Sequence, residues 1–556
     1  MNHLASLNKY FLKYKSHLLL GIFFVTVSNI FGVVPAQLVR NALDVVAENI
    51  QMHHLLNGFN LQSSFYSLFT VSIAVFIFLI LSMTILKGIF MFFMRQSIIV
   101  MSRHIEYDQK NEIFDQYQKL NSTFYNSRNT GDLMNRISED VSRVRMYVGP
   151  AIMYTINLIV MFILVIYAMY HVNARLATYV LVPLPVLTLV IYYVHDIINK
   201  KSEQVQAKLS DLSTYVQESF SGIRVLKSFV REKQSVHDFE KEAEKYKQLN
   251  MDLVRTNSLF YPVLLILVGV STLMTIFIGG TEVIKGNITI GNIAEFIIYV
   301  NMLTWPVASL GWVVTLVQRA AASQERINEF LHTVPEVQSR NSEPFMVKGN
   351  IEFRNVSYQY AHSKIKALQN ISFKVEAGKS LAVTGKTGSG KSSLANLLLR
   401  MMDPSSGAIY IDGKNLHEIN LHNYRSQTGC VPQEVFLFSD TIEQNISFGL
   451  KETSENGTTS EKIKQAAKYA DVFDNIMEFP ENFETMIGER GITLSGGQKQ
   501  RISIARAIIR EPKILIFDDC LSAVDTKTEE NILASLQQLM KGRTTIIISH
   551  RISSVK

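Results

Sequence analysis

Six apolar runs in the first part of this 556-residue chain limit what that part can fold into. Each run has about 20 residues, the length that a helix needs to cross the hydrocarbon layer of a bilayer. Because that layer offers no hydrogen-bond partners to the backbone, each run is predicted to be a transmembrane helix. The N-terminus has no small-residue cleavage site before the first run, which we interpret as a retained span. The runs lie at about 18–39, 66–86, 148–169, 176–194, 259–280 and 293–317.

The connections between the runs differ in charge. The long connections, 87–147 and 195–258, are rich in Lys and Arg, whereas the first connection, 41–65, has neither. Positive charge concentrates on the cytosolic side of membrane proteins, so the long connections, the N-terminus and the C-terminal part are predicted to be cytosolic. The chain is thus predicted to cross the cytoplasmic (inner) membrane several times. Its net charge of +7 does not indicate nucleic-acid binding. Glu295, near the outer end of the sixth run, is interpreted as facing lipid headgroups.

Each long connection contains a candidate docking turn. The segments 105–119 and 202–229 have apolar residues at helical spacing, which predicts helices that continue the spans into the cytosol. Turn-forming residues lie at 124–136 and at 218–224. Spacing alone leaves two interpretations open: short cross-helices docked on another domain, or ordinary solvated helical hairpins.

The segment 385–393 reads GKTGSGKSS and lies between a short apolar run and a helix-like run. A phosphate-binding P-loop requires this order of strand, Gly-rich loop and helix. The glycines let backbone N–H groups turn inward around an anion, and the helix points its positive end at the same place. Lys391 is expected to contact the β- and γ-phosphates of a nucleoside triphosphate, and the Ser392 hydroxyl to ligate Mg²⁺. The expected phosphate-binding residues are Gly385, Lys386, Thr387, Gly388, Ser389, Gly390, Lys391, Ser392 and Ser393.

Two further apolar strand runs end in polar residues. The run 514–517 ends in Asp518-Asp519, and the run 544–548 leads to His550. Buried strands of a parallel sheet present such residues at one edge, beside the P-loop. Asp518 is expected to reach Mg²⁺ through water, and Asp519 to orient or deprotonate the attacking water. His550 is expected to contact the γ-phosphate, with a purely structural histidine as the alternative.

These features predict a multi-domain membrane protein, in which a six-helix, all-α transmembrane domain precedes an α/β P-loop ATPase domain. The transmembrane domain is placed at 1–330, a polar linker at 331–348 and the nucleotide-binding domain at 349–556. The two cysteines imply neither a disulfide framework nor a zinc site.

The segment 494–498, Leu-Ser-Gly-Gly-Gln, resembles the signature motif of ABC ATPases. The whole chain resembles a half-transporter of the bacterial ABC exporter family, which includes lipid flippases and multidrug exporters. The resemblance implies two such chains per transporter, with ATP and Mg²⁺ held between the P-loop of one chain and the signature of the other. Ser495 and the amides of Gly496 and Gly497 open a helix, which gives a second anion site.

The resemblance also implies roles for single residues. Tyr360 matches the aromatic residue that stacks on adenine, and Gln433 matches the Q-loop glutamine, a contact of Mg²⁺ and the catalytic centre. The segment 485–491 matches the loop that contacts the coupling helices, and 522–525 matches the D-loop. The two docking turns match the coupling helices, which favours the docked interpretation. The nucleotide contacts implied outside the P-loop are Tyr360, Ser495, Gly496, Gly497, Gln498 and Asp525.

Two features depart from the family pattern. Asp519 stands where the family usually has Glu, and its side chain is shorter by one C–C bond, about 1.5 Å. Because a base must lie within hydrogen-bond reach of its water, this site is expected to hydrolyse ATP slowly. We therefore predict a heterodimer in which the intact signature completes the partner's faster site; a homodimer with an adequate Asp519 is the alternative. The chain also stops at Lys556, soon after His550, which suggests a truncated domain.

The predicted function is ATP-driven export or flipping of hydrophobic or amphipathic compounds, drugs or lipids, because the spans are rich in Phe and Met. The alternatives are an ATP-gated channel or regulatory subunit, and a homodimeric peptide or lipid exporter. The predicted partners are a second half-transporter chain, membrane lipids and the transported compound.

Overall fold

The computed structural model describes residues 2–55, 61–339, 341–360, 363–450, 458–488, 494–520, 532, 534–535 and 537–550. The chain forms two compact units. The first unit comprises Met1–Asp115 and Met134–His332, and the second comprises Gln116–Leu133 and Thr333–Lys556. The second unit thus includes a short segment from the first long connection.

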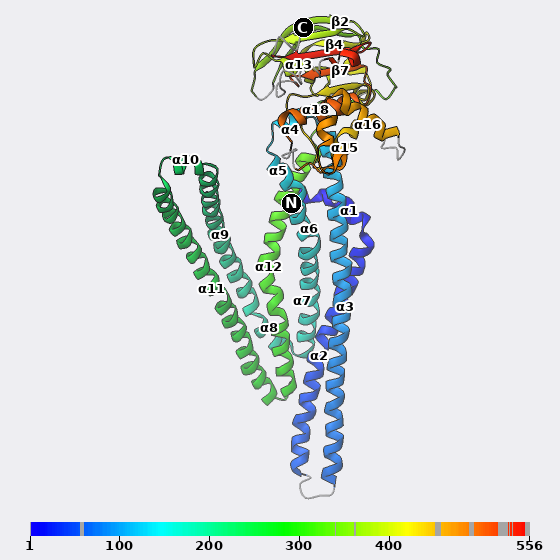
Figure 1. Ribbon diagram of the computed structural model, residues 1–556. Helices are drawn as coiled ribbons and strands as arrows, with labels where there is room; N and C mark the ends of the chain where they lie inside the picture. The colour runs from blue at the N-terminus through cyan, green and yellow to red at the C-terminus, as the bar shows by residue number, and fades with distance from the viewer. Residues whose placement is uncertain are drawn as a thin grey trace. The chain divides into compact units, whose positions relative to one another are not determined.

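The first unit is built from long helices (Figure 1). At its start, the 3-10 turn η1 (Asn2–Leu7) and α1 (Asn8–Lys13) precede α2 (Lys15–Leu55) and α3 (Leu61–Lys119). The elements that follow α5 (Thr130–Asn135) are the π-helical turn η2 (Arg136–Asp140), α6 (Val141–Met146), the π-helical turn η3 (Tyr147–Ala151), α7 (Ile152–Val172), α8 (Ala174–Leu181), α9 (Pro183–Ser221), α10 (Ile223–Ser228), α11 (Glu232–Ile284) and α12 (Ile290–Leu331).

Among the described residues, 5 helices are long and apolar enough to cross a membrane. They contain the first, second, third, fifth and sixth predicted runs. The fourth run, 176–194, is helical but divided, because α8 ends at Leu181 and α9 begins at Pro183. The shorter apolar helix Ala174–Val186 runs across this interruption. Proline has no N–H to donate, which accounts for the break in the hydrogen-bond ladder.

Helices α2, α7, α8, α11 and α12 share one apolar core. Phe296 and Tyr299 of α12 are completely buried in it, together with Met169 of α7 and Leu176 of α8. Burial of these large side chains holds the membrane helices of the unit together through close packing.

Glu295 does not face lipid headgroups, so that interpretation was wrong. Its side chain is fully buried and pairs with Arg40 of α2, whose Nη1 lies 3.2 Å from Glu295 Oε2. The Tyr299 hydroxyl donates to Glu295 Oε1 at 2.8 Å, and Asn292 Nδ2 donates to Oε2 at 3.1 Å. A buried carboxylate is tolerated when it is paired and hydrogen-bonded in this way. The network therefore joins α2 to α12.

The second unit contains two four-stranded sheets. The antiparallel sheet has the order β2-β1-β4-β5, with β1 (Ile351–Gln359), β2 (Lys366–Val375), β4 (Ser406–Ile411) and β5 (Lys414–Asn415). The parallel sheet has the order β3-β8-β7-β6, with β3 (Ser380–Thr384), β6 (Thr428–Val431), β7 (Ile514–Asp518) and β8 (Thr544–Ser549).

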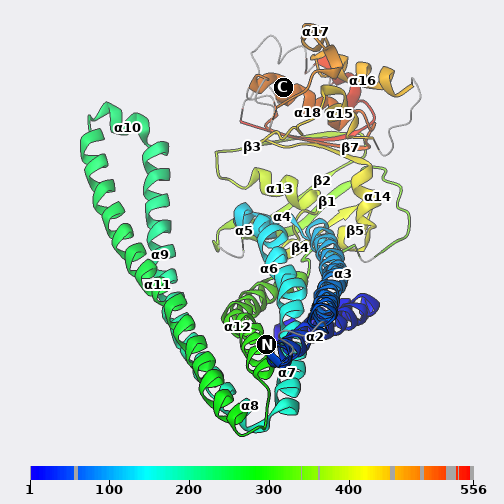
Figure 2. The same ribbon diagram turned by 90° about the horizontal axis from the view of Figure 1, so that it is seen from below.

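The helices of the second unit lie on both sides of the parallel sheet (Figure 2). Side chains of β7 alternate between two apolar cores: Ile514 and Ile516 pack with α13 and the antiparallel sheet, whereas Leu515 and Phe517 pack with α15, α16 and α18. Such a strand, apolar on both faces, is typical of a parallel sheet covered on each side. The helical elements are α4 (Ser122–Asn126), α13 (Lys391–Leu398), η4 (Leu416–Glu418), α14 (Leu421–Ser426), α15 (Ile442–Ser447), α16 (Thr458–Tyr469), α17 (Phe473–Met477), η5 (Asn482–Glu484) and α18 (Gly496–Ile508).

Glu295→Ala is expected to lower the stability of the chain by about 2 kcal/mol, because it leaves Arg40 without its buried partner. The expected loss is smaller than for a fully enclosed pair, since the Arg40 side chain is 30% exposed. Thermal unfolding of the detergent-solubilised chain measures the effect. The double variant Arg40→Met/Glu295→Leu should regain stability, and Glu139→Ala, which removes an exposed carboxylate, serves as the control. An unchanged unfolding temperature for Glu295→Ala would contradict the assigned role of this pair.

Candidate functional site

The polar residues predicted to act together follow the carboxyl ends of four neighbouring parallel strands. In the register of the sheet, Thr384 of β3 lies beside Ser549 of β8, and Ile548 of β8 lies beside Asp518 of β7. Val431 of β6 pairs with Phe517 of β7. The P-loop, His550, the Asp518-Asp519 pair and Gln433 therefore leave one edge of the same sheet, where α/β proteins bind ligands.

The P-loop joins β3 to α13, and its backbone requires glycine. Gly388 and Gly390 have φ values of +79° and +91°, in the left-handed region that side chains disfavour. A Cβ on Gly390 would also lie 2.2 Å from the carbonyl oxygen of Ala367. Lys391, the first residue of α13, is buried, and its Nζ donates to the carbonyl oxygens of Gly385 and Lys386, each at 2.9 Å. The ammonium group thus lies over the loop, beside amides suited to bind an anion.

Asp518 ends β7 and is nearly fully buried. Burial is the largest influence on this carboxyl and raises its pKa; a hydrogen bond with Ser392 opposes the rise, the neighbouring Asp519 adds to it, and Lys391 and His550 oppose it. A hydroxyl and a carboxylate are oxygen donors of the kind that Mg²⁺ prefers. Among the described residues no group of three His, Cys, Asp or Glu side chains could hold a metal ion. The Ser392 hydroxyl and the Asp518 carboxylate fit a Mg²⁺ ion that would complete its coordination with water and phosphate oxygens.

Asp519 directly follows β7 in an unusual backbone conformation. Its φ is +48°, and its N–H donates to the Ile548 carbonyl oxygen of β8 at 2.9 Å. Asp is among the residues that tolerate the left-handed region. The neighbouring strand thus holds the backbone from which this carboxylate projects. His550 follows β8, and its side chain is exposed at the same edge.

Tyr360 is half-buried, whereas Gln433 is exposed. The Tyr360 hydroxyl is 2.9 Å from Ser393 Oγ, so this ring is tied to the first turn of α13. The Tyr358 ring meets it edge-on, with 5.0 Å between centroids. Gln433 follows β6 and is exposed. Tyr360 is therefore held beside the P-loop by a side-chain contact, whereas Gln433 is placed by its strand.

Ser495 and Gln498 cap the start of α18. Ser495 Oγ accepts a hydrogen bond from the Gln498 N–H at 3.3 Å, and Gln498 Oε1 accepts one from the Ser495 N–H at 2.9 Å. This reciprocal pair is a capping box, which satisfies two of the amides at a helix start. The amides of Gly496 and Gly497 precede the first intrahelical donors and are suited to an anion. The D-loop residue Asp525 and residues 489–491 lie outside the described residues.

An asparagine and an arginine that the sequence analysis did not select join two parts of the site region. Arg506 of α18 donates from Nε to the Asn445 carbonyl oxygen at 2.8 Å and from Nη2 to Asn445 Oδ1 at 2.7 Å. Asn445 of α15 also exchanges hydrogen bonds with the Phe438 backbone, at 2.8 and 3.0 Å. Burial lowers the pKa of Arg506 to about 10. The only sequence signal was a charged residue inside the apolar stretch of α18.

The first docking turn makes contacts within the second unit. Gln116 Nε2 donates to the Thr333 carbonyl oxygen at 2.7 Å, and Asn121 Nδ2 donates to Glu336 Oε2 at 3.0 Å. The Ser122 hydroxyl lies 3.4 Å from the carbonyl oxygen of Met401, which follows α13. These contacts are of the kind that the docked interpretation requires for this turn.

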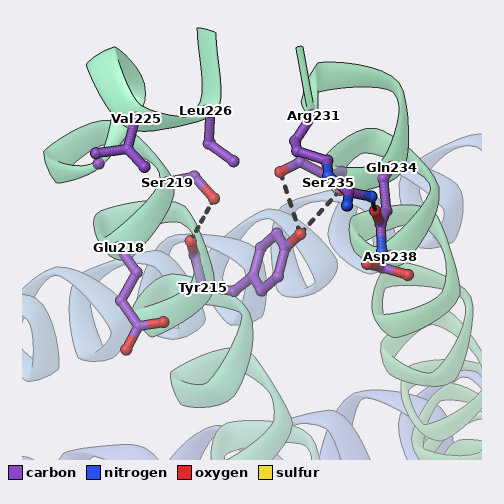
Figure 3. Close-up of a pocket in the computed structure, with 10 residues that line it drawn as sticks. Tyr215, Glu218, Ser219, Val225, Leu226, Arg231, Gln234, Ser235 and Asp238 are labelled. Atoms are coloured by element: carbon purple, nitrogen blue, oxygen red, sulfur yellow. Dashed lines mark hydrogen bonds between the residues drawn. The ribbon is translucent and has the colours of Figure 1, made fainter. Parts of the chain in front are cut away.

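The second docking turn is the helical tip formed by α9, α10 and α11 (Figure 3). The Tyr215 hydroxyl lies 3.0 Å from the Ser235 carbonyl oxygen and 3.1 Å from Ser235 Oγ, which joins α9 to α11. The three helices line a hollow of about 660 Å³. Phe220, Val225 and Phe229 are 73%, 60% and 71% exposed at the tip. Exposed apolar residues in one place are typical of a surface that contacts another protein.

Asn445→Ala is expected to destabilise the second unit by about 2 kcal/mol, because Arg506 Nη2 and the backbone N–H and carbonyl of Phe438 lose their side-chain hydrogen-bond partner. Thermal unfolding of the full chain measures this loss. Gln444→Ala, in the same helix but at an exposed position, is the matched control and should have little effect. Equal unfolding temperatures for the two variants would show that the Asn445 network contributes no stability.

Comparisons with known proteins agree with this arrangement. Residues 18–307 match the family model described as ABC transporter transmembrane region, and residues 368–522 match the one described as ABC transporter. A solved structure described as a bacterial Atm1-family ABC exporter with ATP bound superposes with a TM-score of 0.73 at 24% identity. That superposition covers 99% of this chain and 92% of the other. The predicted fold class is thereby confirmed.

The chain aligns with curated relatives over most of its length. The ABC transporter ATP-binding protein YknU of Bacillus subtilis (strain 168) is 34% identical over 478 residues, 86% of this chain and 81% of its own length. The multidrug resistance-like ATP-binding protein MdlA of Escherichia coli (strain K12) is 35% identical, over 82% of this chain and 76% of its own. The ATP-dependent lipid A-core flippase of Syntrophus aciditrophicus (strain SB) is 33% identical, over 84% and 76%. The chain therefore belongs to the ABC transporter family, as an exporter-type member that joins a transmembrane region and an ATPase domain in one polypeptide.

Proposed function

We propose that this chain is one half of a dimeric exporter that uses ATP to move hydrophobic or amphipathic compounds, drugs or lipids, out across the cytoplasmic membrane. As a member of its family the chain is an ATPase coupled to transport. The observation that carries the proposal is the single polypeptide that joins apolar membrane helices to a sheet edge bearing a P-loop, Asp518, Asp519 and His550. Two of the relatives compared are named as multidrug resistance-like and lipid A-core flippase proteins, which supports drugs or lipids as the transported class.

In the proposed mechanism, each residue acts from the place that the fold gives it. The P-loop amides and Lys391 bind the β- and γ-phosphates of ATP, and Tyr360 stacks on adenine. Ser392, Asp518 and Gln433 hold Mg²⁺ directly or through water. When bound, Mg²⁺ neutralises charge on the phosphate oxygens. Asp519 orients the attacking water, and His550 contacts the γ-phosphate.

The signature segment serves the other chain of the dimer. Ser495, Gly496, Gly497 and Gln498 present amides and a capped helix start to the γ-phosphate bound by the partner, and Asp525 completes that contact. ATP binding closes the two nucleotide-binding domains, and the two docking turns transmit this closure to the membrane helices. Hydrolysis then resets the transporter.

We further propose that the dimer is asymmetric. The Asp519 carboxylate is one C–C bond shorter than that of Glu, and its backbone is held by β8 through the hydrogen bond to Ile548. The carboxylate therefore has little freedom to move toward the attacking water, which makes it a weak general base. The capped signature helix is complete, so the site that it serves, which lies across the dimer, is the faster one.

ATP-dependent uptake of a hydrophobic dye into inside-out membrane vesicles tests the exporter function. Uptake is expected with the intact chain and its partner, and it should fall to background in Lys391→Ala, which removes the charge on the phosphates. Arg103→Ala, an exposed arginine outside the nucleotide site, is the control. Nucleotide-dependent ion conductance that is independent of any transported compound would instead indicate an ATP-gated channel.

Asp519→Glu is expected to raise the ATPase rate of the purified chain about tenfold or more, because the longer side chain brings the carboxylate into reach of the water. Asp519→Asn, which keeps the size but removes the base, should not raise the rate. Steady-state phosphate release measures both. If the unaltered chain alone transports and hydrolyses ATP at the rate of Asp519→Glu, the chain functions as a homodimer and the asymmetric dimer is wrong.

A further inference from the structure

A cavity of about 550 Å³ lies among α3, α6, η3, α7 and α12, all within the first unit. Its size falls in the range of pockets that bind drug-sized molecules. Most of its wall is apolar or aromatic, with Phe92 from α3, Met153 and Tyr154 from α7 and Trp312 from α12. The polar part of the wall is a neighbouring pair on α3, Arg95 and Gln96.

The aromatic side of this cavity is preformed. The Tyr154 and Trp312 rings meet edge-on, with 5.5 Å between centroids and an interplanar angle of 77°. Met153, which also lines the cavity, is buried, whereas Trp312 and Phe92 are 42% and 58% exposed. Edge-to-face aromatic rings and a thioether form a polarizable surface that accepts flat or flexible apolar groups.

The charge of Arg95 is uncompensated. Within the described part of the chain, no carboxylate lies within ion-pair distance of this side chain, and the described residues that line the cavity include no Asp or Glu. Nearby arginines are paired instead: Arg103 Nη1 lies 3.0 Å from Glu106 Oε2, and Arg145 Nε lies 3.4 Å from the same atom. An unpaired guanidinium beside apolar residues favours an anionic ligand and repels a cationic one.

We propose that this cavity binds the transported compound and that the compound is an anionic amphipath. Its phosphate, sulfate or carboxylate group binds to Arg95, with Gln96 as a second donor, and its apolar body lies against Trp312, Tyr154 and Met153. A guanidinium suits such groups because it donates two parallel hydrogen bonds to them. This assignment rests on the proposed exporter function and narrows its substrate class from hydrophobic compounds in general to those that carry an acidic group.

The chain has two tryptophans, so tryptophan emission can report binding in the cavity. The variant Trp305→Phe leaves Trp312 as the sole tryptophan, and the complementary variant Trp312→Phe leaves Trp305, which is not among the lining residues. The full chain is placed in nanodiscs of phosphatidylcholine without ATP and titrated with dodecyl phosphate, dodecyl maltoside or dodecyltrimethylammonium. These probes share one alkyl chain and differ in charge. Dodecyl phosphate is expected to shift Trp312 emission at the lowest concentration and to leave Trp305 emission unchanged.

Replacing the arginine tests its role. Arg95→Gln is expected to weaken dodecyl phosphate binding about tenfold, as for the loss of a charge-assisted hydrogen bond, and to leave dodecyl maltoside binding unchanged. Arg95→Lys should retain part of the preference for the anion. Arg103→Gln removes the same charge from the same helix at a paired position and should retain binding. Equal affinities for the three probes, or an unchanged affinity in Arg95→Gln, would overturn the proposal.

Further measurements identify the source of the anion and distinguish the substrate proposal from the exporter proposal. Competition by added phosphatidylglycerol would identify a bilayer lipid as an occupant, whereas inorganic phosphate alone should not bind, because it lacks the apolar body. Lys391→Ala should bind dodecyl phosphate normally, since the measurement needs no nucleotide. If the unaltered chain with its partner binds the anion but shows no ATP-dependent transport, only the exporter function is contradicted. If the unaltered chain transports without any preference for anions, only the substrate class is contradicted.

Discussion

The chemistry of the second unit depends on β7, a strand that is buried on both faces along its whole length. Burial holds this strand between β8 and β6, and the parallel register then brings their carboxyl ends to one edge. Because Asp518 ends such a strand, its carboxylate is withdrawn from water and its pKa is raised. A nearby cation stabilises a carboxylate in this position, and Lys391 begins the adjoining helix α13, where Ser392 also hydrogen-bonds to Asp518. One candidate site thus forms from segments far apart in the chain.

The Asn445–Arg506 network connects this site region with the signature segment. Arg506 belongs to α18, which begins with the capping box of Ser495, while Asn445 holds the backbone of Phe438 in the segment that follows Gln433. The guanidinium carbon also lies 5.7 Å from the ring centroids of both Phe438 and Phe448. Hydrogen bonds and a shared apolar core therefore both join the signature helix to the region after Gln433.

Sequence reasoning succeeded where the relevant physics is local. The P-loop depends on glycine spacing and on the strand and helix beside it, and the strand ends at Asp518 and His550 follow from apolar runs that stop at a polar residue. It failed for Glu295, because the partner that determines its burial, Arg40, is 255 residues away. The fourth predicted span is helical, with an interruption at Val182, before Pro183. The roles of Asn445 and Arg95 likewise depend on neighbours that only folding brings near.

By itself the sequence determined the membrane helices, the Gly-rich loop between β3 and α13, and the family, because span length, loop spacing and the signature motif are properties of short contiguous segments. Only the tertiary structure decided which side chains share an environment. It buried Glu295 against Arg40, tied Arg506 to Asn445 and left Arg95 unpaired beside Trp312. These outcomes depend on packing between distant helices, since burial and pairing of a charge are set by whatever the fold places around it.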